Sequence, residues 1–139
     1  MEACAQPLGM EDFTIPDENI TASTYWIGEP FRGRLNYQGF FGSWRGSENG
    51  NLQWLQIYLA SFKKVTKIAT QGNRLYDWWL TQFAVAYSNE STDSSFIKYQ
   101  ENGGLKVICF FPVNITLFFS VVAISSSDFR NNWLVTIGY

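Results

Sequence analysis

A short alternation of apolar and polar residues near the middle of the chain constrains its fold more than any other feature. Residues 53–59 place Leu55, Ile57 and Leu59 at every second position. Because successive side chains of a β-strand point to opposite faces, this spacing puts all three on one face. The segment therefore predicts a half-buried β-strand.

Two further segments predict strands. Residues 64–70 are typical of a strand, and residues 83–88 place Phe83, Val85 and Tyr87 on one face. Turn segments rich in Gly, Asn or Ser lie at residues 37–39, 46–51 and 89–95. Short strands separated by frequent turns predict an all-β sandwich or barrel.

The size and composition of the chain indicate one globular domain. Its 139 residues can bury a sizeable core, and 46% hydrophobic against 16% charged residues excludes a disordered tail. A formal charge of −2 disfavours nucleic acid as a partner. The chain has no His, which removes His-based catalysis and nearly all catalytic zinc sites. Aromatic residues make up 18%, more than a small core needs, so some rings are expected at the surface.

Cysteines, sequons and the first residues bear on the cellular location. Cys4 and Cys109 allow one disulfide, and their spacing fits no zinc or redox motif. Asn19, Asn89 and Asn114 each begin an N-x-S/T sequon, which favours a secreted glycoprotein. The first residues have neither the basic start nor the apolar core of a signal peptide. The chain is therefore either cytosolic or a piece of a longer secreted protein.

Residues 107–124 form an uncharged, mostly apolar run. A membrane-spanning helix needs about 20 such residues, so the run is just long enough. Pro112, Asn114 and Thr116 interrupt it, and buried strands broken at Pro112 are the favoured interpretation.

Several motifs follow one another in a characteristic order. They are the segments CAQPLGMED, ITAS, RGRLN, QWLQI, TQG and YS, beginning at residues 4, 20, 32, 53, 70 and 87, together with Trp44 and Trp79. In order and spacing they resemble discoidin domains, also called coagulation factor V/VIII type C domains, over residues 4–107. The resemblance implies one domain over residues 1–139, folded as an eight-stranded antiparallel jelly-roll barrel. It also implies an extracellular, non-catalytic binding module.

The chain departs from the family pattern in two places. Tyr58 and Ala60 stand where family members usually have Asp and Gly. After Lys106 the family's closing motifs are missing, so residues 107–139 are interpreted as a divergent apolar tail. Three alternatives stay open: the barrel is incomplete at its C-terminal end, unrelated strands close it, or the tail comes from a mis-joined coding segment. The family's usual disulfide joins the first Cys to a closing Cys that this chain lacks. A bridge between Cys4 and Cys109 is open but does not follow from the family pattern.

The resemblance implies that ligands meet three loops at one end of the barrel. In this sequence these are loop 1 (residues 25–30), loop 2 (residues 36–43) and loop 3 (residues 72–79). Trp26 lies outside any alternating segment, and the adjacent Phe40 and Phe41 cannot both point inward from a strand, so exposed rings are expected. The predicted ligand-binding residues are Trp26, Ile27, Phe40, Phe41, Arg74, Tyr76, Asp77 and Trp78. Arg34, Trp54 and Trp79 are predicted to be structural.

The predicted function is adhesion through these loops to a cell-surface glycan, a protein or an anionic phospholipid. The alternatives are a structural spacer in a larger receptor or secreted protein and, less favoured, an accessory domain of a carbohydrate-active enzyme. An enzyme without His would need paired carboxylates or a Ser/Lys arrangement, and no spacing supports one. No cofactor is expected, although relatives sometimes hold a structural calcium ion through backbone oxygens near the barrel end. The expected context is a larger multidomain chain at the cell surface or outside the cell.

The divergent tail still contains strand-forming sequence. Residues 115–119, 121–124 and 133–137 have high β-propensity and could fill one or two strand positions of the barrel. Uncharged segments of this kind aggregate when they are left unpaired. The isolated chain is therefore predicted to be poorly soluble and marginally stable.

Overall fold

The structure is a computed structural model of the chain. The structure describes residues 6–26, 29–47, 53–61, 64–76, 82–88, 96–105, 107–109, 122–124 and 132–138. Within these residues the strands pair antiparallel throughout. The described helices are two short 3₁₀ turns, η1 (Asp17–Asn19) and η2 (Pro30–Gly33). The predicted all-β antiparallel fold is confirmed.

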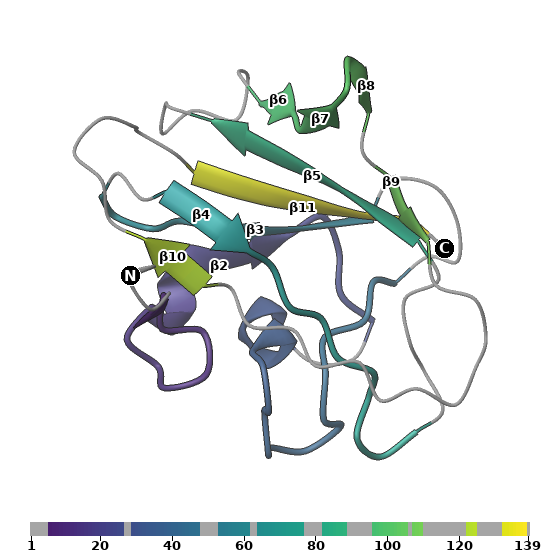
Figure 1. Cartoon of the computed structure of the whole chain (residues 1–139). Coiled ribbons are helices and arrows are strands. Elements are labelled where there is room, and N and C mark those ends of the chain that lie inside the picture. Colours follow the sequence, from purple (N-terminus) through teal and green to yellow (C-terminus); the bar gives the residue numbers. More distant parts are fainter. Residues whose placement is uncertain are drawn as a thin grey trace.

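The larger sheet has six strands and runs across the middle of the molecule (Figure 1). Its order is β2 (Ile20–Ala22), β3 (Gln53–Ile57), β11 (Asn132–Gly138), β5 (Gln82–Ser88) and β6 (Ile97–Lys98), and β9 (Val107–Cys109) also pairs with β5. Two of the three predicted strands, residues 53–59 and 83–88, thus lie in this sheet on either side of β11.

A smaller sheet and a separate hairpin complete the strands. The sheet has the order β1 (Gln6–Pro7), β10 (Val122–Ile124) and β4 (Lys64–Lys67). The third predicted strand corresponds to β4, which ends three residues earlier than the predicted segment. The hairpin joins β7 (Gln100–Glu101) to β8 (Gly104–Leu105) and lies at the top of the view in Figure 1.

The core lies between the two sheets. Leu55, Ile57 and Leu59 are all buried, as the alternation predicts, and they cluster with Phe83 and Val85 of β5. On the other side the core packs against partly buried hydrophobic residues of the β4 region, Val65 and Ile68. This burial of apolar surface is the main favourable free-energy term of folding. The arrangement is a β-sandwich.

The C-terminal strands belong to both sheets. β11 pairs with β5 from Asn132 opposite Ser88 to Gly138 opposite Gln82, and its other edge pairs with β3. β10 lies between β1 and β4. Two of the three strand-forming stretches predicted in the tail, residues 121–124 and 133–137, therefore overlap strands of the structure. The third, residues 115–119, lies outside the described residues.

Two other predictions concern the C-terminal part. Cys109 ends β9, whereas Cys4 lies outside the described residues, so their disulfide stays a prediction. Residues 110–121 of the apolar run also lie outside the described residues. In the part of the chain that is described, no helix has the length and apolar character needed to cross a membrane.

Candidate binding loops

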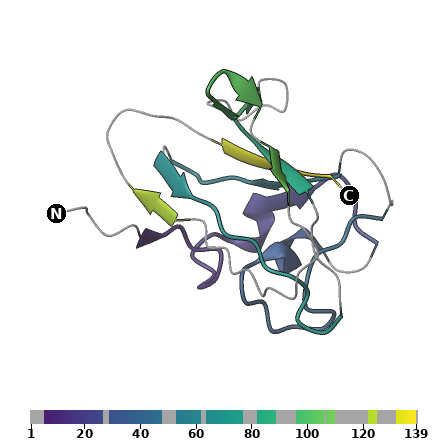
Figure 2. The same ribbon diagram turned by 45° about the vertical axis from the view of Figure 1, so that its right-hand side comes forward.

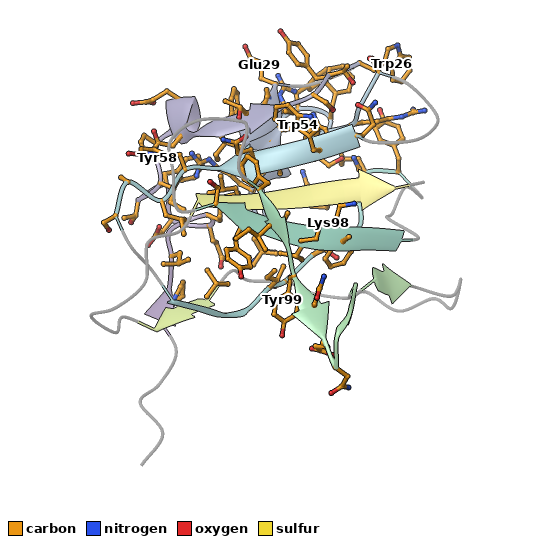
Figure 3. The ribbon with its side chains drawn as sticks, turned by 90° about the horizontal axis from the view of Figure 1, so that it is seen from above. Trp26, Glu29, Trp54, Tyr58, Lys98 and Tyr99 are labelled. Atoms are coloured by element: carbon orange, nitrogen blue, oxygen red, sulfur yellow. The ribbon has the colours of Figure 1, made fainter. Side chains whose placement is uncertain are left out.

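Loops 2 and 3 project together from one end of the sandwich. In Figures 1 and 2 the segments around residues 36–43 (blue) and 70–76 (teal) descend side by side at the bottom of the molecule. In Figure 3, which looks down on the sheet, Trp26 of loop 1 lies beyond the end where β3 begins, and Tyr58 lies at the opposite end of that strand. The three loops are built differently.

Loop 1 presents a tryptophan over an arginine. Trp26 is 56% exposed, as the sequence predicts for this position. Its ring lies 4.6 Å from the Arg45 guanidinium carbon, and its backbone N–H donates to the Arg45 carbonyl over 2.9 Å. The ring and the cation form a cation–π pair at the protein surface. Ile27, also predicted to bind ligand, lies outside the described residues.

A buried glutamine holds the base of loop 1. Gln53 is 4% exposed, and its side-chain oxygen accepts hydrogen bonds from the hydroxyls of Ser23, over 2.9 Å, and Thr24. The Thr24 hydroxyl accepts from the Ser47 backbone N–H over 3.0 Å. Trp44 donates its indole N–H to the Thr24 carbonyl over 3.0 Å. Sequence reasoning missed this network, because its members lie about thirty or twenty residues apart.

Loop 2 carries the most exposed ring at this end. Phe40 is 77% exposed, whereas Phe41 is only partly exposed. Their rings meet edge to face with centroids 4.6 Å apart. The Gly42 N–H donates to the Gly39 carbonyl, so the two Phe residues occupy a turn, and Phe41 has a φ of 65°. The predicted exposure of one ring is therefore correct, but a turn rather than strand alternation produces it.

Arg32 supports loop 2. Its Nη1 donates to the Phe40 carbonyl over 2.6 Å. Its guanidinium carbon lies 5.7 Å from the Phe41 ring centroid and 5.9 Å from that of Phe31. The sequence prediction did not single out Arg32, because nothing local connects it to a carbonyl eight residues later.

Loop 3 lies against loop 2. Leu75 and Tyr76 are exposed, and Arg74 is exposed and donates to the Gln38 carbonyl of loop 2 over 3.4 Å. Asn73, which the sequence prediction omitted, donates to the Phe41 carbonyl over 2.7 Å. The structure thus brings Phe40, Phe41, Arg74 and Tyr76 into neighbouring loops. Asp77, Trp78 and Trp79 lie outside the described residues, so their predicted roles and an Arg74–Asp77 pair stay predictions.

Arg34 anchors the segment of residues 10–17. It is 4% exposed and donates to the carbonyls of Met10 and Ile15 and to the Asp17 carboxylate. Phe13, an exposed ring in the same segment, lies over its guanidinium at 4.7 Å. These contacts support the predicted structural role of Arg34.

Hydrogen bonds of Trp54 and Asn36 join the bases of loops 1 and 2 to neighbouring segments. The Trp54 backbone carbonyl accepts from the Ser23 N–H, and its N–H donates to the Ser23 hydroxyl, so strand β3 and the base of loop 1 are joined there. The Asn36 side chain donates to the Glu11 carboxylate over 2.7 Å and links loop 2 to the segment of residues 10–17. Trp54 is half-buried on β3 (Figure 3), and its structural role stays a prediction.

The described residues offer little for metal binding or acid–base chemistry. Among them no group of three or more Cys, Asp or Glu side chains is placed to hold a metal ion. The calcium predicted to bind backbone oxygens stays a prediction. Asn19 begins the one sequon whose Asn is described; it is partly exposed, and its Nδ2 donates to the Tyr58 carbonyl over 3.2 Å. Asn89 and Asn114 lie outside the described residues, and glycosylation at all three stays a prediction.

Comparison with known proteins identifies the family. The family model described as F5/8 type C domain matches residues 19–134, and so reaches β10 and the start of β11 beyond the residues that carry the motif resemblance. Coagulation factor V of Sus scrofa is 41% identical over 101 residues, which cover 67% of this chain and 4% of that protein. Lactadherin of Sus scrofa is 37% identical over 116 residues, which cover 76% of this chain and 28% of that protein. The venom prothrombin activator omicarin-C non-catalytic subunit of Oxyuranus microlepidotus is 37% identical over 99 residues, which cover 66% of this chain and 7% of that protein. The chain thus spans less than a third of the length of these relatives, and it belongs to the F5/8 type C, or discoidin, domain family.

Proposed function

We propose that this chain is a non-catalytic, extracellular module of a longer protein and that it binds anionic phospholipid surfaces through loops 1, 2 and 3. The proposal rests mainly on the observation that each loop combines an exposed apolar side chain with an arginine. Trp26 lies on Arg45, Phe40 receives a hydrogen bond from Arg32 at its carbonyl, and Leu75 adjoins Arg74. A membrane surface has two matching layers, a layer of phosphates and the acyl chains beneath it. The exposed apolar side chains would enter the acyl layer, and the arginines would contact the phosphates.

The free-energy contributions of single side chains are small, so the three loops must act together. Complete burial of one large apolar side chain contributes about 1.5–3 kcal/mol. Each Lys or Arg near an anionic membrane adds about 1 kcal/mol. One loop therefore gives weak, reversible binding, and a useful affinity requires the three loops to contact the membrane together. The net charge of −2 makes this attraction a local property of the loops rather than of the whole chain.

The polar groups of the loops favour lipid over glycan as the ligand. A glycan site needs side-chain donors and acceptors that are available to sugar hydroxyls. The side-chain amide of Asn36 donates to Glu11, that of Gln38 donates to the Asn36 carbonyl, and that of Asn73 donates to the Phe41 carbonyl. These amides are already engaged within the protein, whereas the Phe40 ring faces solvent. This pattern suits insertion of rings more than hydrogen-bonded recognition of a sugar.

Vesicle binding tests the proposal. The secreted chain would be sedimented with phosphatidylcholine vesicles that contain or lack phosphatidylserine, and the same protein would be applied to a glycan array. We expect binding that requires phosphatidylserine and that falls roughly tenfold in Phe40→Ser, in line with the burial of one ring. Tyr99→Ser is the matched control, because Tyr99 is an exposed ring next to β6, which lies at the top of Figure 1, whereas loop 2 lies at the bottom.

Three results would overturn the proposal. They are equal binding to both kinds of vesicle, glycan binding without vesicle binding, and equal losses in Phe40→Ser and Tyr99→Ser. Absence of all binding by the folded chain would favour the structural spacer.

A further inference from the structure

The side chain of Asn73 connects loops 2 and 3 with all of its hydrogen-bonding capacity. Its Nδ2 donates to the Phe41 carbonyl over 2.7 Å and to the Ser43 hydroxyl over 2.5 Å. Its Oδ1 accepts from the backbone N–H groups of Leu75, over 2.7 Å, and Tyr76, over 3.0 Å. An asparagine amide has two donor hydrogens and two acceptor lone pairs, so these four bonds satisfy it.

The contact is close on the side of loop 2. A Cβ atom added to Gly42 would lie 3.2 Å from the Asn73 Oδ1, and Gly42 has a φ of +68°. Loop 2 therefore packs its backbone directly against the amide, at a turn that a larger residue would strain. A second bond between loops 2 and 3, from Arg74 to the Gln38 carbonyl, is longer at 3.4 Å and exposed. Asn73 is the stronger link.

We propose that Asn73 is a positioning residue that fixes the exposed side chains of loops 2 and 3 in one orientation for ligand binding. This inference rests on the proposed function, and it adds a residue that acts through Phe40, Leu75 and Tyr76. The Phe41 carbonyl that it holds directly follows Phe40, and the N–H groups that it accepts from belong to Leu75 and Tyr76. Loops that are ordered before binding lose less conformational freedom when the ligand arrives.

The amide is needed because it donates on one side and accepts on the other. An aspartate at this position keeps acceptors for the Leu75 and Tyr76 N–H groups but loses both donors. Its negative charge would also face the Phe41 carbonyl oxygen. Asn73→Asp should therefore release loop 2 while it preserves the turn of loop 3.

A double-mutant cycle on vesicle binding tests the inference. The cycle compares the wild type, Phe40→Ala, Asn73→Asp and the double variant on phosphatidylserine-containing vesicles. We expect Asn73→Asp to weaken binding roughly two- to tenfold, the range for loss of order in one side chain. We also expect Phe40→Ala to cost clearly less in the Asn73→Asp background, because a ring that is no longer held contributes less. An equal fold-loss in both backgrounds would overturn the inference.

Hydrogen exchange separates this inference from the lipid proposal. In the free protein, Asn73→Asp should speed amide exchange in residues 38–43 and leave residues 75 and 76 nearly unchanged. Hydrogen exchange is measured without ligand, so its result tests the role of Asn73 even if the vesicle experiments show that lipid is not bound. Unchanged exchange in residues 38–43 would also overturn the inference. Ser43→Ala removes one of the same bonds from the other side, and it replaces Asn73→Asp in the cycle and in the exchange experiment if that variant does not fold.

Discussion

The sandwich and the loop end of this molecule are held together by different forces. In the sandwich, backbone ladders join β3, β11 and β5, and apolar side chains such as Phe83 fill the space between the sheets. At the loop end, single side chains donate to backbone carbonyls, as Asn73 does to Phe41 and Arg32 does to Phe40. Stability therefore depends mainly on the first region, and the shape of the binding surface on the second.

Side-chain hydrogen bonds hold strained backbone at the loop end. Among the described residues, five non-glycine residues have positive φ values of 53° to 65°, and two of them, Asn36 and Phe41, lie in loop 2; the others are Phe13, Ala60 and Asn102. A non-glycine residue in this conformation costs on the order of 1–3 kcal/mol where the structure over-determines it. The Asn36 N–H donates to the Gln71 side chain over 2.7 Å, and the Phe41 carbonyl accepts from Asn73. Side-chain hydrogen bonds thus hold the strained turns of loop 2 in place.

Removal of β11 should have the largest effect, because this strand lies in the centre of the larger sheet. Deletion of residues 132–139 would leave facing edges of β3 and β5 unpaired. We expect loss of cooperative thermal unfolding and of soluble yield, measured by circular dichroism and by expression in an oxidising compartment.

The control is a chimaera in which a typical family ending replaces residues 107–139. The predicted marginal stability of the native chain implies that this chimaera is more soluble than the wild type. A native chain that melts as cooperatively as the chimaera would show that the tail closes the sandwich well, and a cooperative deletion variant would contradict the central role of β11.

Phe83→Ala should have the next largest effect. Phe83 is 1% exposed and lies in the core cluster. Large-to-small changes of buried aromatic residues cost about 3–5 kcal/mol. We expect a clear fall in the free energy of unfolding in urea, with vesicle affinity of the remaining folded protein unchanged. A loss of affinity without a loss of stability would reverse the assignment of roles to the two regions.

Arg34→Ala should destabilise the protein less than Phe83→Ala. Its removal leaves the buried carbonyls of Met10 and Ile15 without their donor, which costs about 1–3 kcal/mol. The ion pair with Asp17 adds little, because the Asp17 side chain is half exposed to solvent. Chemical unfolding would measure the loss, and Arg32→Ala is the matched control. That variant should weaken vesicle binding more than Arg34→Ala while it destabilises the fold less.

The sequence predicted the parts of the fold that depend on local periodicity. The alternation of Leu55, Ile57 and Leu59 fixes which face of β3 is buried, and that burial is confirmed. Family motifs placed Trp26 and Phe40 in loops, and both rings are exposed. The position of β11 between β3 and β5 did not follow from the sequence, because its register depends on pairing with strands far away in the chain.

The supports of the loops were also not predictable. Asn73 and Phe41 are 32 residues apart, and Gln53 and Ser23 are 30 apart. Neither pair leaves a local pattern, since one polar residue in a turn is common whether or not it makes such a bond. The hydrogen-bond partners of Arg34 were also not predictable. The motif around Arg34 indicated an anchoring residue, but only the fold shows that Arg34 holds residues 10–17.

The smallest expected effect concerns Asp12, in the segment that Arg34 anchors. Its carboxylate accepts from the Thr14 backbone N–H over 3.0 Å. Hydrogen bonding from Thr14 lowers the pKa of Asp12 below its ordinary value, because the bond favours the charged form. A lowered pKa in the folded state contributes stability that is present above the unfolded pKa of about 3.9 and is lost as the pH falls through the folded pKa. Asp12→Asn should therefore melt slightly below the wild type at neutral pH, and this difference should shrink in acid. Carbon-13 NMR titration of the Asp12 carboxyl carbon would give the midpoint directly. A midpoint at or above the ordinary aspartate value, or a melting difference that grows as the pH falls, would show that this turn is not stabilised by the charge.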